Sequence, residues 1–208
     1  MQAVATPNKQ QLRREASYNA LVDSALRLFQ ERGYAATTVS DIVEPTPYSA
    51  GAFYYHFANK TDCFWHVVEY RDELRGEWWT IPGGMTPETT SLTAVIGDAL
   101  GRLARSLRGH TAWTLVMVDF YQQHRDDPDV RARLAELYDS WREQVGRFMQ
   151  SLQAGGWVDP GRDPMLLATQ VLAFQEGLST HANVFSFDES LLQAASVDGV
   201  TRLLGPTP

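Results

Sequence analysis

The sequence predicts an all-α protein: an N-terminal domain of three short helices, a helical bundle behind it, and about nine helices in total. Three observations support this. Apolar residues recur at intervals of three and four, the period of an amphipathic helix. Glycine and proline punctuate the chain between these segments. No segment shows the strict apolar–polar alternation that is typical of a half-buried strand.

The first three helices are expected at residues 13–32, 39–44 and 49–53. Gly33 follows the first and is typical of the end of a helix. Thr37 or Thr38 would cap the second, which must stop before Pro45 because proline cannot continue a helix. Only a short turn, which contains Pro47, then separates the second helix from the third. The spacing predicts a tri-helical helix-turn-helix.

A long fourth helix is expected from Asn59, its N-cap, to Trp78 or Trp79. The turn-forming run 81–84 (Ile-Pro-Gly-Gly) then separates two parts of the chain. Five more helices are expected, at 88–107, 111–124, 128–154, 163–184 and 189–204. The predicted organisation is a DNA-binding domain over 1–60, a connecting helix over 60–79, and a ligand-binding and dimerisation domain over 80–208.

The charge is distributed unevenly along the chain. The net charge is −7, but residues 1–70 hold six Lys and Arg against seven Asp and Glu, whereas residues 71–208 hold twelve against eighteen. The acidity therefore belongs to the part that need not touch nucleic acid. The N-terminal part is close to neutral, so DNA binding would depend on a few well-placed cations rather than on a strong general field.

Other features argue against a membrane protein or an enzyme. No apolar run approaches the roughly 18 residues of a membrane span, and residues 1–11 lack the apolar region of a signal peptide, so a soluble cytoplasmic protein is expected. Cys63 is a lone cysteine, so no cofactor and no metal are expected. His66 lies three residues after Cys63 and four after Asp62, but no catalytic or metal-binding motif surrounds them. The sequence does not favour an enzyme.

One stretch, over about residues 15–70, resembles the TetR family of bacterial transcription regulators. The matching positions agree in order and spacing, and they are Leu28-Phe29, Arg32-Gly33-Tyr34, Ala36-Thr37-Thr38, Asp41-Ile42-Val43, Ser49-Ala50-Gly51-Ala52-Phe53-Tyr54-Tyr55-His56-Phe57 and Asn59-Lys60. The resemblance implies a DNA-binding regulator, with repression as its usual mode. Beyond residue 70 the chain is similar to the family only in the number and lengths of its helices.

The candidate DNA-binding residues cluster around the third helix, and they are Thr38, Tyr48, Ser49, Ala50, Gly51, Tyr54, Tyr55, His56 and Lys60. Thr38 and Lys60 are candidates for phosphate contacts at helix N-termini. The family resemblance implies that Tyr55 and His56 face the DNA backbone. Tyr48, Ser49, Ala50 and Tyr54 are placed to read sequence. Phe53, Phe57 and Tyr34 are expected to be core residues.

Two departures from the family pattern affect this interface. Pro47 stands in the turn where relatives usually have glycine, and proline cannot supply the left-handed conformation of a turn glycine. Ala50 stands where many relatives have a polar or basic residue. An alternative hypothesis is therefore a helical small-molecule-binding protein whose DNA binding is weakened or lost.

The second part carries two further predictions. Aromatic and apolar side chains of its middle helices are candidates to line a ligand pocket, because sites form between the helices of bundles; these are Trp79, Trp113, Met117, Phe120, Trp141, Phe148, Phe174 and His181. The implied ligand is small and apolar or aromatic, and it would release a repressor from a palindromic operator. Stripes on the last two helices are candidates for a homodimer interface: Leu167, Val171, Phe174, Leu178, Leu192, Val200 and Leu203. Burial of these stripes within the protomer core is the competing interpretation.

Overall fold

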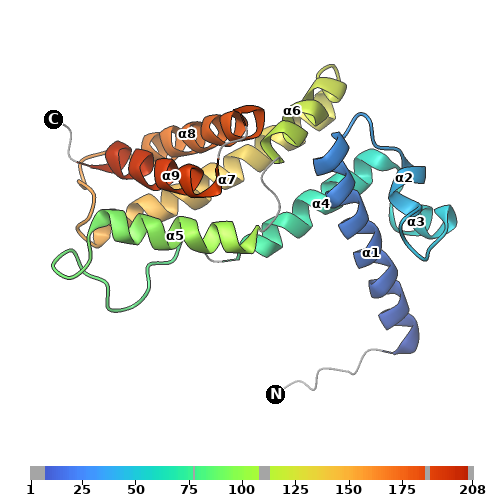
Figure 1. The fold of residues 1–208 in the computed structure, drawn as a ribbon, viewed down its shortest axis with the longest axis horizontal. Helices are drawn as coiled ribbons and strands as arrows, with labels where there is room; N and C mark the ends of the chain where they lie inside the picture. The colour runs from blue at the N-terminus through green and yellow to red at the C-terminus, as the bar shows by residue number, and fades with distance from the viewer. Residues whose placement is uncertain (1–7, 77, 108–112, 186–187, 206–208) are drawn as a thin grey trace. The chain divides into compact units, whose positions relative to one another are not determined.

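The computed structural model describes residues 8–76, 78–107, 113–185 and 188–205. Within these ranges the chain forms helices and no strand (Figure 1), which confirms the all-α prediction. No helix in the described part of the chain is both long and apolar enough to cross a membrane. The helices are α1 (Lys9–Arg32), α2 (Val39–Val43), α3 (Ala50–His56), α4 (Lys60–Arg75), α5 (Leu92–Ser106), α6 (Trp113–His124), α7 (Pro128–Ala154), α8 (Pro164–Phe185) and α9 (Glu189–Leu204).

The chain divides into two compact units, residues 1–74 and 75–208. In the first unit, α1, α2 and α3 pack against one another as the helix-turn-helix pattern predicts. An aromatic cluster forms part of its core: Phe29, Tyr34 and Phe64 have ring centroids 5.3–5.8 Å apart. Phe53 and Phe57 are buried at 5.1 Å from each other. The first set of contacts joins α1 to α4. Phe57, directly after α3, also lies 5.7 Å from Tyr18 of α1 and 5.2 Å from His66 of α4, which fixes the end of the third helix against both.

Several helix boundaries in this unit differ from the predictions. α1 begins four residues earlier than expected, because the Asn8 side chain accepts hydrogen bonds from the amides of Gln10 and Gln11 in a capping box. α3 extends to His56 rather than ending at Phe53. Asn59 caps α4 as predicted, through a bond from the amide of Asp62 to its Oδ1 at 2.9 Å.

The fourth helix ends earlier than the sequence suggests, and the fifth begins later. α4 ends at Arg75 instead of continuing to Trp78 or Trp79, and Gly76 has a φ of +56°, a left-handed conformation that stops a helix. α5 begins at Leu92 rather than at Glu88, since Ser91 is its N-cap and accepts a bond from the amide of Ala94. α7 begins at Pro128 and ends before Gly155, as predicted.

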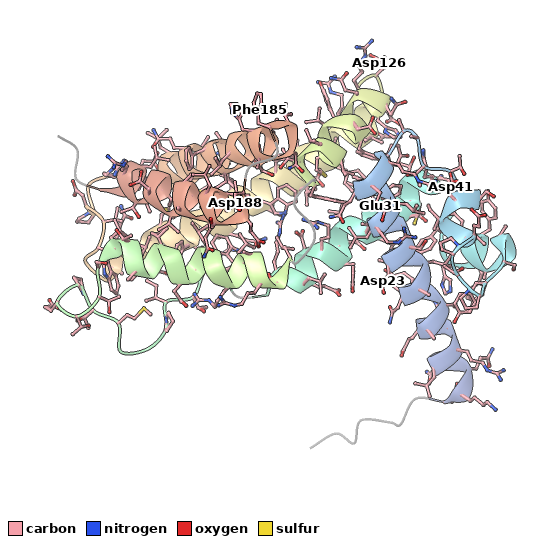
Figure 2. All side chains as sticks on the ribbon, in the orientation of Figure 1. Asp23, Glu31, Asp41, Asp126, Phe185 and Asp188 are labelled. Atoms are coloured by element: carbon pink, nitrogen blue, oxygen red, sulfur yellow. The ribbon has the colours of Figure 1, made fainter. Side chains whose placement is uncertain are left out.

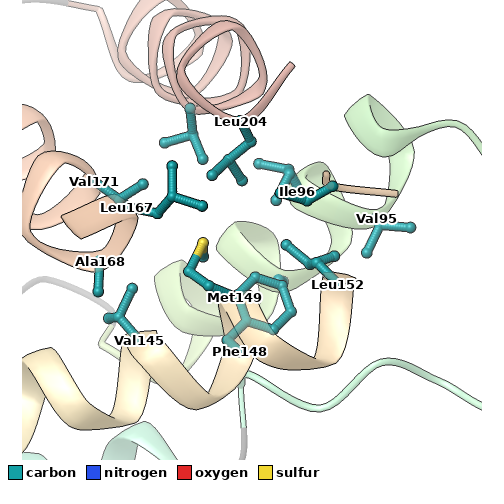
Figure 3. Close-up of a cluster of buried hydrophobic side chains, with 13 residues drawn as sticks. Val95, Ile96, Val145, Phe148, Met149, Leu152, Leu167, Ala168, Val171 and Leu204 are labelled. Carbon is teal, nitrogen blue, oxygen red and sulfur yellow. The ribbon is translucent and has the colours of Figure 1, made fainter. Parts of the chain in front are cut away.

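In the second unit, α5, α7, α8 and α9 run side by side and enclose an apolar core (Figures 1 and 3). The core side chains that Figure 3 labels are Val95, Ile96, Val145, Phe148, Met149, Leu152, Leu167, Ala168, Val171 and Leu204. α6 packs against α7 and α8 at the side of this cluster. The unit is a helical bundle, as the sequence predicts.

Candidate nucleic-acid interface

The third helix, α3, separates buried from exposed aromatic residues. Phe53 and, just beyond its C-terminus, Phe57 are buried in the core of the first unit, whereas Tyr54 and Tyr55 keep 60% and 68% of their surface exposed. Adjacent exposed aromatic side chains are typical of an interaction surface. The outer face of α3 therefore presents two tyrosines, while its inner face packs into the core of the first unit.

The N-terminal end of α3 is small and open. Ser49 is the N-cap, but its side chain makes no capping hydrogen bond, so its hydroxyl is not needed for the fold. Ala50 and Gly51 follow, both exposed. A Cβ at Gly51 would lie 3.5 Å from the Ser49 hydroxyl, an ordinary contact, so the glycine is not forced by packing. Because Gly51 has no side chain, the helix backbone can approach another surface closely at this end.

The side chain of Thr46 holds the turn that precedes α3. The hydroxyl of Thr46 donates to the carbonyl of Val43 at 2.8 Å and accepts from the amide of Tyr48 at 3.3 Å. The amide of Thr46 also donates to the Val43 carbonyl, at 2.9 Å. These bonds close the turn between Pro45 and Pro47. Sequence reasoning identified the prolines but missed Thr46, although hydroxyl residues are known to stabilise turns.

Thr38 and Lys60 are both engaged within the protein, so their predicted phosphate contacts meet competition. The Thr38 hydroxyl donates to the carboxylate of Asp41, which also accepts from the Thr38 amide at 2.8 Å. These bonds hold the pKa of Asp41 below its usual value. The hydroxyl and the amide of Thr38 are therefore already bound by a carboxylate of the same helix.

The Lys60 ammonium has its own partners in the loop after α1. It donates to the carbonyls of Tyr34 at 2.9 Å and Thr37 at 2.8 Å, and it lies 4.2 Å from the centroid of the Tyr34 ring. A third carbonyl, of Ala35, lies 3.5 Å away. An ammonium has three protons to donate. In this structure Lys60 caps the α1–α2 loop, and its phosphate contact stays a prediction.

His56 also faces inward. Its Nε2 lies 2.8 Å from the hydroxyl of Ser17 on α1, and its ring packs edge-on against Tyr18. Partial burial lowers the pKa of His56, and the nearby positive charge of Arg14 lowers it further. The predicted residues Tyr48, Ser49, Ala50, Gly51, Tyr54 and Tyr55 lie together on α3 or directly before it, with all but the half-buried Tyr48 exposed. Thr38, His56 and Lys60 contribute to the scaffold.

The predicted pocket residues fall into separate groups in the second unit. Trp113, Met117 and Phe120 share the buried face of α6, as the periodicity predicts. Trp141 is buried on α7, beneath the guanidinium of Arg75 at 4.4 Å from its ring centroid. The structure does not place all eight candidates around one site.

The remaining candidates have other roles. Phe148 belongs to the core, and Trp79 and Phe174 pack against that core. Phe174 lies directly on Gly199 of α9, where an added Cβ would overlap its ring. His181 is exposed and contacts Phe185 at the end of α8, whose side chain points away from the bundle (Figure 2). Phe174 and His181 are therefore helix-packing and surface residues.

A half-buried carboxylate lies at the α7–α8 contact. Burial raises the pKa of Glu176, and no hydrogen bond reaches its carboxylate from the described residues. Burial, followed by the charge of Glu176, raises the pKa of Tyr138 to about 12, while the positive charge of Arg75 opposes this shift. Neither Tyr138 nor Glu176 is among the candidate site residues that the sequence predicts.

The predicted dimer residues on α8 and α9 belong largely to the protomer. Leu167, Val171 and Val200 are buried inside the second unit, so they cannot contact another copy. They alternate with a second stripe on α8 that faces outward: Leu166, Ala173, Gly177 and Val184. The spacing of seven, four and seven places these four residues on one face of the helix. The periodicity of α8 singles out the stripe with Leu167 and Val171 but not this second, exposed one, and a dimer interface on α8 and α9 stays a prediction.

A helix-turn-helix with an outward-facing tyrosine pair, followed by a separate helical bundle, defines a helix-turn-helix transcriptional regulator. Family comparison agrees with this class. Residues 21–67 match the model described as bacterial regulatory proteins of the tetR family, and residues 90–205 match the BetI-type transcriptional repressor C-terminal model. The chain belongs to the TetR family.

Individual relatives support the same assignment. The chain is 39% identical over 203 residues to the HTH-type transcriptional regulator YwcC of Bacillus subtilis, which covers 91% of this chain and 88% of the relative. It is 26% identical to the HTH-type transcriptional repressor ComR of Escherichia coli, over 90% and 88% of the two chains. The crystal structure of the regulatory protein TetR from Rhodobacter sphaeroides has the same fold, with a TM-score of 0.68, 20% identity, and coverage of 91% and 97%.

Proposed function

We propose that this protein is a transcriptional repressor that binds a palindromic operator as a homodimer and is released by a small apolar or aromatic molecule. The observation that carries the DNA-binding part is the exposed face of α3. Tyr54 and Tyr55 project from a helix whose opposite side, at Phe53, is fully buried. Such a helix fits the major groove of B-DNA, which is wide enough to admit an α-helix. A regulator of transcription acts where the DNA is, so a cytoplasmic location follows from the same proposal.

Repression is favoured by the names of two matches: the BetI-type repressor C-terminal model and the repressor ComR. A single helix-turn-helix covers few base pairs, so a specific site needs two copies. The outward stripe of Leu166, Ala173, Gly177 and Val184 on α8 supports a second copy of this chain as the partner. Leu166 and Val184 keep 56% and 61% of their surface exposed, which is high for apolar side chains on one face.

The apolar ligand is supported by α6 and α7. Trp113, Met117 and Phe120 form one buried aromatic-rich face, and Trp141 lies on the neighbouring helix. A ligand that binds better to a dimer whose α3 helices are wrongly spaced lowers DNA affinity by that difference alone. α4 provides a covalent route for this coupling, because it begins in the first unit and its last residue, Arg75, belongs to the second.

The DNA-binding proposal is tested by selection from a pool of random-sequence duplexes, followed by anisotropy titrations on the enriched sequence. We expect a palindrome with half-site centres about 34–36 Å apart, and binding that weakens as salt rises. Tyr54→Ala should reduce affinity for that sequence without a loss of helical circular dichroism. Tyr121→Ala, an exposed tyrosine on α6, is the matched control and should bind as the parent does. Absence of salt-sensitive binding to every duplex would overturn the proposal.

The same result would favour the alternative function, a helical small-molecule-binding protein without DNA binding. The observation behind it is that Lys60 and Thr38 are both occupied inside the protein. A thermal-shift screen of small aromatic and acyl compounds then provides the second measurement. Trp113→Ala and Phe120→Ala should abolish the shift given by a stabilising compound. If the parent chain does bind an operator, both variants should keep its unliganded affinity. Loss of both properties together would indicate misfolding instead.

A further inference from the structure

The first unit contains seven described cations, and most of them are committed to the fold. Arg27 is paired with Glu31 at 2.9 Å, and Arg32 lies 3.4 Å from Asp41. Lys60 donates to backbone carbonyls, and Arg71 is buried. The remaining described cations of this unit are Lys9, Arg13 and Arg14, which form no ion pair with other described residues. All three are exposed and lie on the first two turns of α1.

These three cations lie on the side of α1 that meets α3. Ser17 marks that side, because its hydroxyl contacts His56. At about 100° per residue, Arg13 and Arg14 lie about 40° and 60° to either side of Ser17, and Lys9 about 80° away. Glu15 lies about 160° away, on the opposite side of the helix. The positive charge therefore faces in the same direction as the C-terminal end of α3.

Arg14 connects this cluster directly to the candidate interface. Its guanidinium carbon lies 5.8 Å from the centroid of the Tyr55 ring, within the range of a cation–π contact. Tyr55 keeps 68% of its surface exposed on the outer face of α3. The contact places a guanidinium at the edge of the surface that would enter the major groove.

Lys9 and Arg13 extend the cluster beyond α3. Eight residues separate Lys9 from Ser17, which is about 12 Å along the helix axis. That length corresponds to three or four base pairs of B-DNA, at roughly 3.4 Å for each. Figure 2 shows nitrogen-ended side chains spreading from the N-terminal end of α1, while Asp23 and Glu31 lie further along the helix. The family model begins at residue 21, so these cations lie outside the residues that it matches.

We infer that Lys9, Arg13 and Arg14 form a second DNA contact, a basic clamp that binds the phosphates flanking the half-site read by α3. The inference rests on the proposed DNA-binding function. Charge identifies the phosphate backbone of DNA as the partner, because these cations lack counter-charges and border the exposed tyrosines. The other cation that the sequence predicts to bind phosphate, Lys60, donates to backbone carbonyls instead. The first unit holds seven Lys and Arg against nine Asp and Glu, so only four of its cations lie outside the clamp. The clamp would therefore supply most of the salt-dependent affinity.

The clamp predicts a change in salt dependence rather than in sequence preference, because phosphate contacts carry no base information. The experiment measures affinity for the selected duplex across a salt series, for the parent chain and for a double variant, Arg13→Gln with Arg14→Gln. Each lost phosphate contact should reduce the slope of log K against log salt by about 0.9, so the double variant should lose about 1.8. Arg27→Gln, on the same helix but paired with Glu31, is the control and should keep the parent slope.

A second arm needs no variant of the protein. The parent chain is titrated with a duplex trimmed by four base pairs on each side, and its salt slope should fall toward that of the double variant on the full duplex. If the double variant keeps the parent slope while Tyr54→Ala loses affinity, the clamp is wrong and the α3 interface stands. If the parent chain binds no duplex in a salt-sensitive way, both the clamp and the proposed function are overturned.

Discussion

Ser17 on α1 and His56 on α3 are joined by a hydrogen bond of 2.8 Å between Oγ and Nε2. The bond links the last turn of α3 to α1, the helix that supports it. The Ser17 hydroxyl also donates to the carbonyl of Arg14 at 2.9 Å. Because a hydroxyl has one proton, the serine oxygen can only accept from His56, and the neutral imidazole donates through Nε2.

This relationship predicts an acid-sensitive DNA-binding unit. Burial and the charge of Arg14 lower the pKa of His56 below the ordinary 6.5. Between the lowered folded value and 6.5, the unfolded chain binds more protons than the folded one, so stability rises with pH across that window. The contribution of neutral His56 to the free energy of unfolding is fully present above about pH 6.5, and it is lost as the pH falls through the pKa of the folded state.

Thermal unfolding measured from pH 7.5 to pH 5 tests this expectation. The parent chain should lose melting temperature as the pH falls, and His56→Gln, which cannot titrate, should show a flatter profile. The carboxylates common to both proteins cancel in the comparison. Parallel profiles for the two proteins would contradict the role assigned to His56.

The Thr46 hydroxyl predicts a turn variant with a specific phenotype. Thr46→Ala removes the bonds to the Val43 carbonyl and from the Tyr48 amide, and it should cost about 1–2 kcal/mol at about 1 kcal/mol for each bond. DNA affinity should fall further than stability does, because the turn sets the direction of α3. Thr46→Ser keeps the hydroxyl and should retain both properties. Equal affinities for the alanine and serine variants would show that the turn is held by its prolines alone.

Lys60 should behave as a structural residue. Lys60→Met removes bonds from a charged donor to the carbonyls of Tyr34 and Thr37, so we expect a loss of about 2 kcal/mol in the free energy of unfolding. Lys9→Met, at the exposed start of α1, should leave that free energy unchanged. Urea unfolding of both variants makes the comparison. If Lys60→Met unfolds like the parent chain but loses DNA affinity, Lys60 leaves its carbonyls to bind phosphate, as the sequence alone predicted.

The sequence was sufficient wherever local chemistry decides the structure. α7 was predicted to the residue, because Pro128 fits the first turn of a helix and Gly155 marks its end. Burial of Phe53 and Phe57, and exposure of Tyr54 and Tyr55, followed from the motif. The family assignment followed from the same residues.

The sequence was insufficient where a side chain chooses between partners that are distant along the chain. Lys60 binds carbonyls more than twenty residues away, and no local pattern reveals them. On α8, the stripe containing Leu167 and the stripe containing Leu166 have the same period. Packing of α7 and α9 decides that Leu167 is inside, and that information lies outside the helix itself.

Two glycines on neighbouring helices give a matched test of the proposed dimer surface. Gly177 lies in the outward stripe of α8, and a Cβ added there meets no atom within 4 Å. At Gly199 on α9, by contrast, a Cβ would overlap the ring of Phe174. A substitution at Gly177 therefore spares the protomer, whereas one at Gly199 disturbs its core.

We expect Gly177→Arg to convert the dimer to a folded monomer. Arginine is a better helix former than glycine, so the helix itself should not weaken, but two buried charges without partners would oppose association of the stripes. Light scattering after size-exclusion chromatography measures the mass, and thermal unfolding reports the fold. Gly199→Ala should instead lower the melting temperature of the protomer. If Gly177→Arg remains a dimer at micromolar concentration, the second copy binds elsewhere, and the outward stripe of α8 has another role.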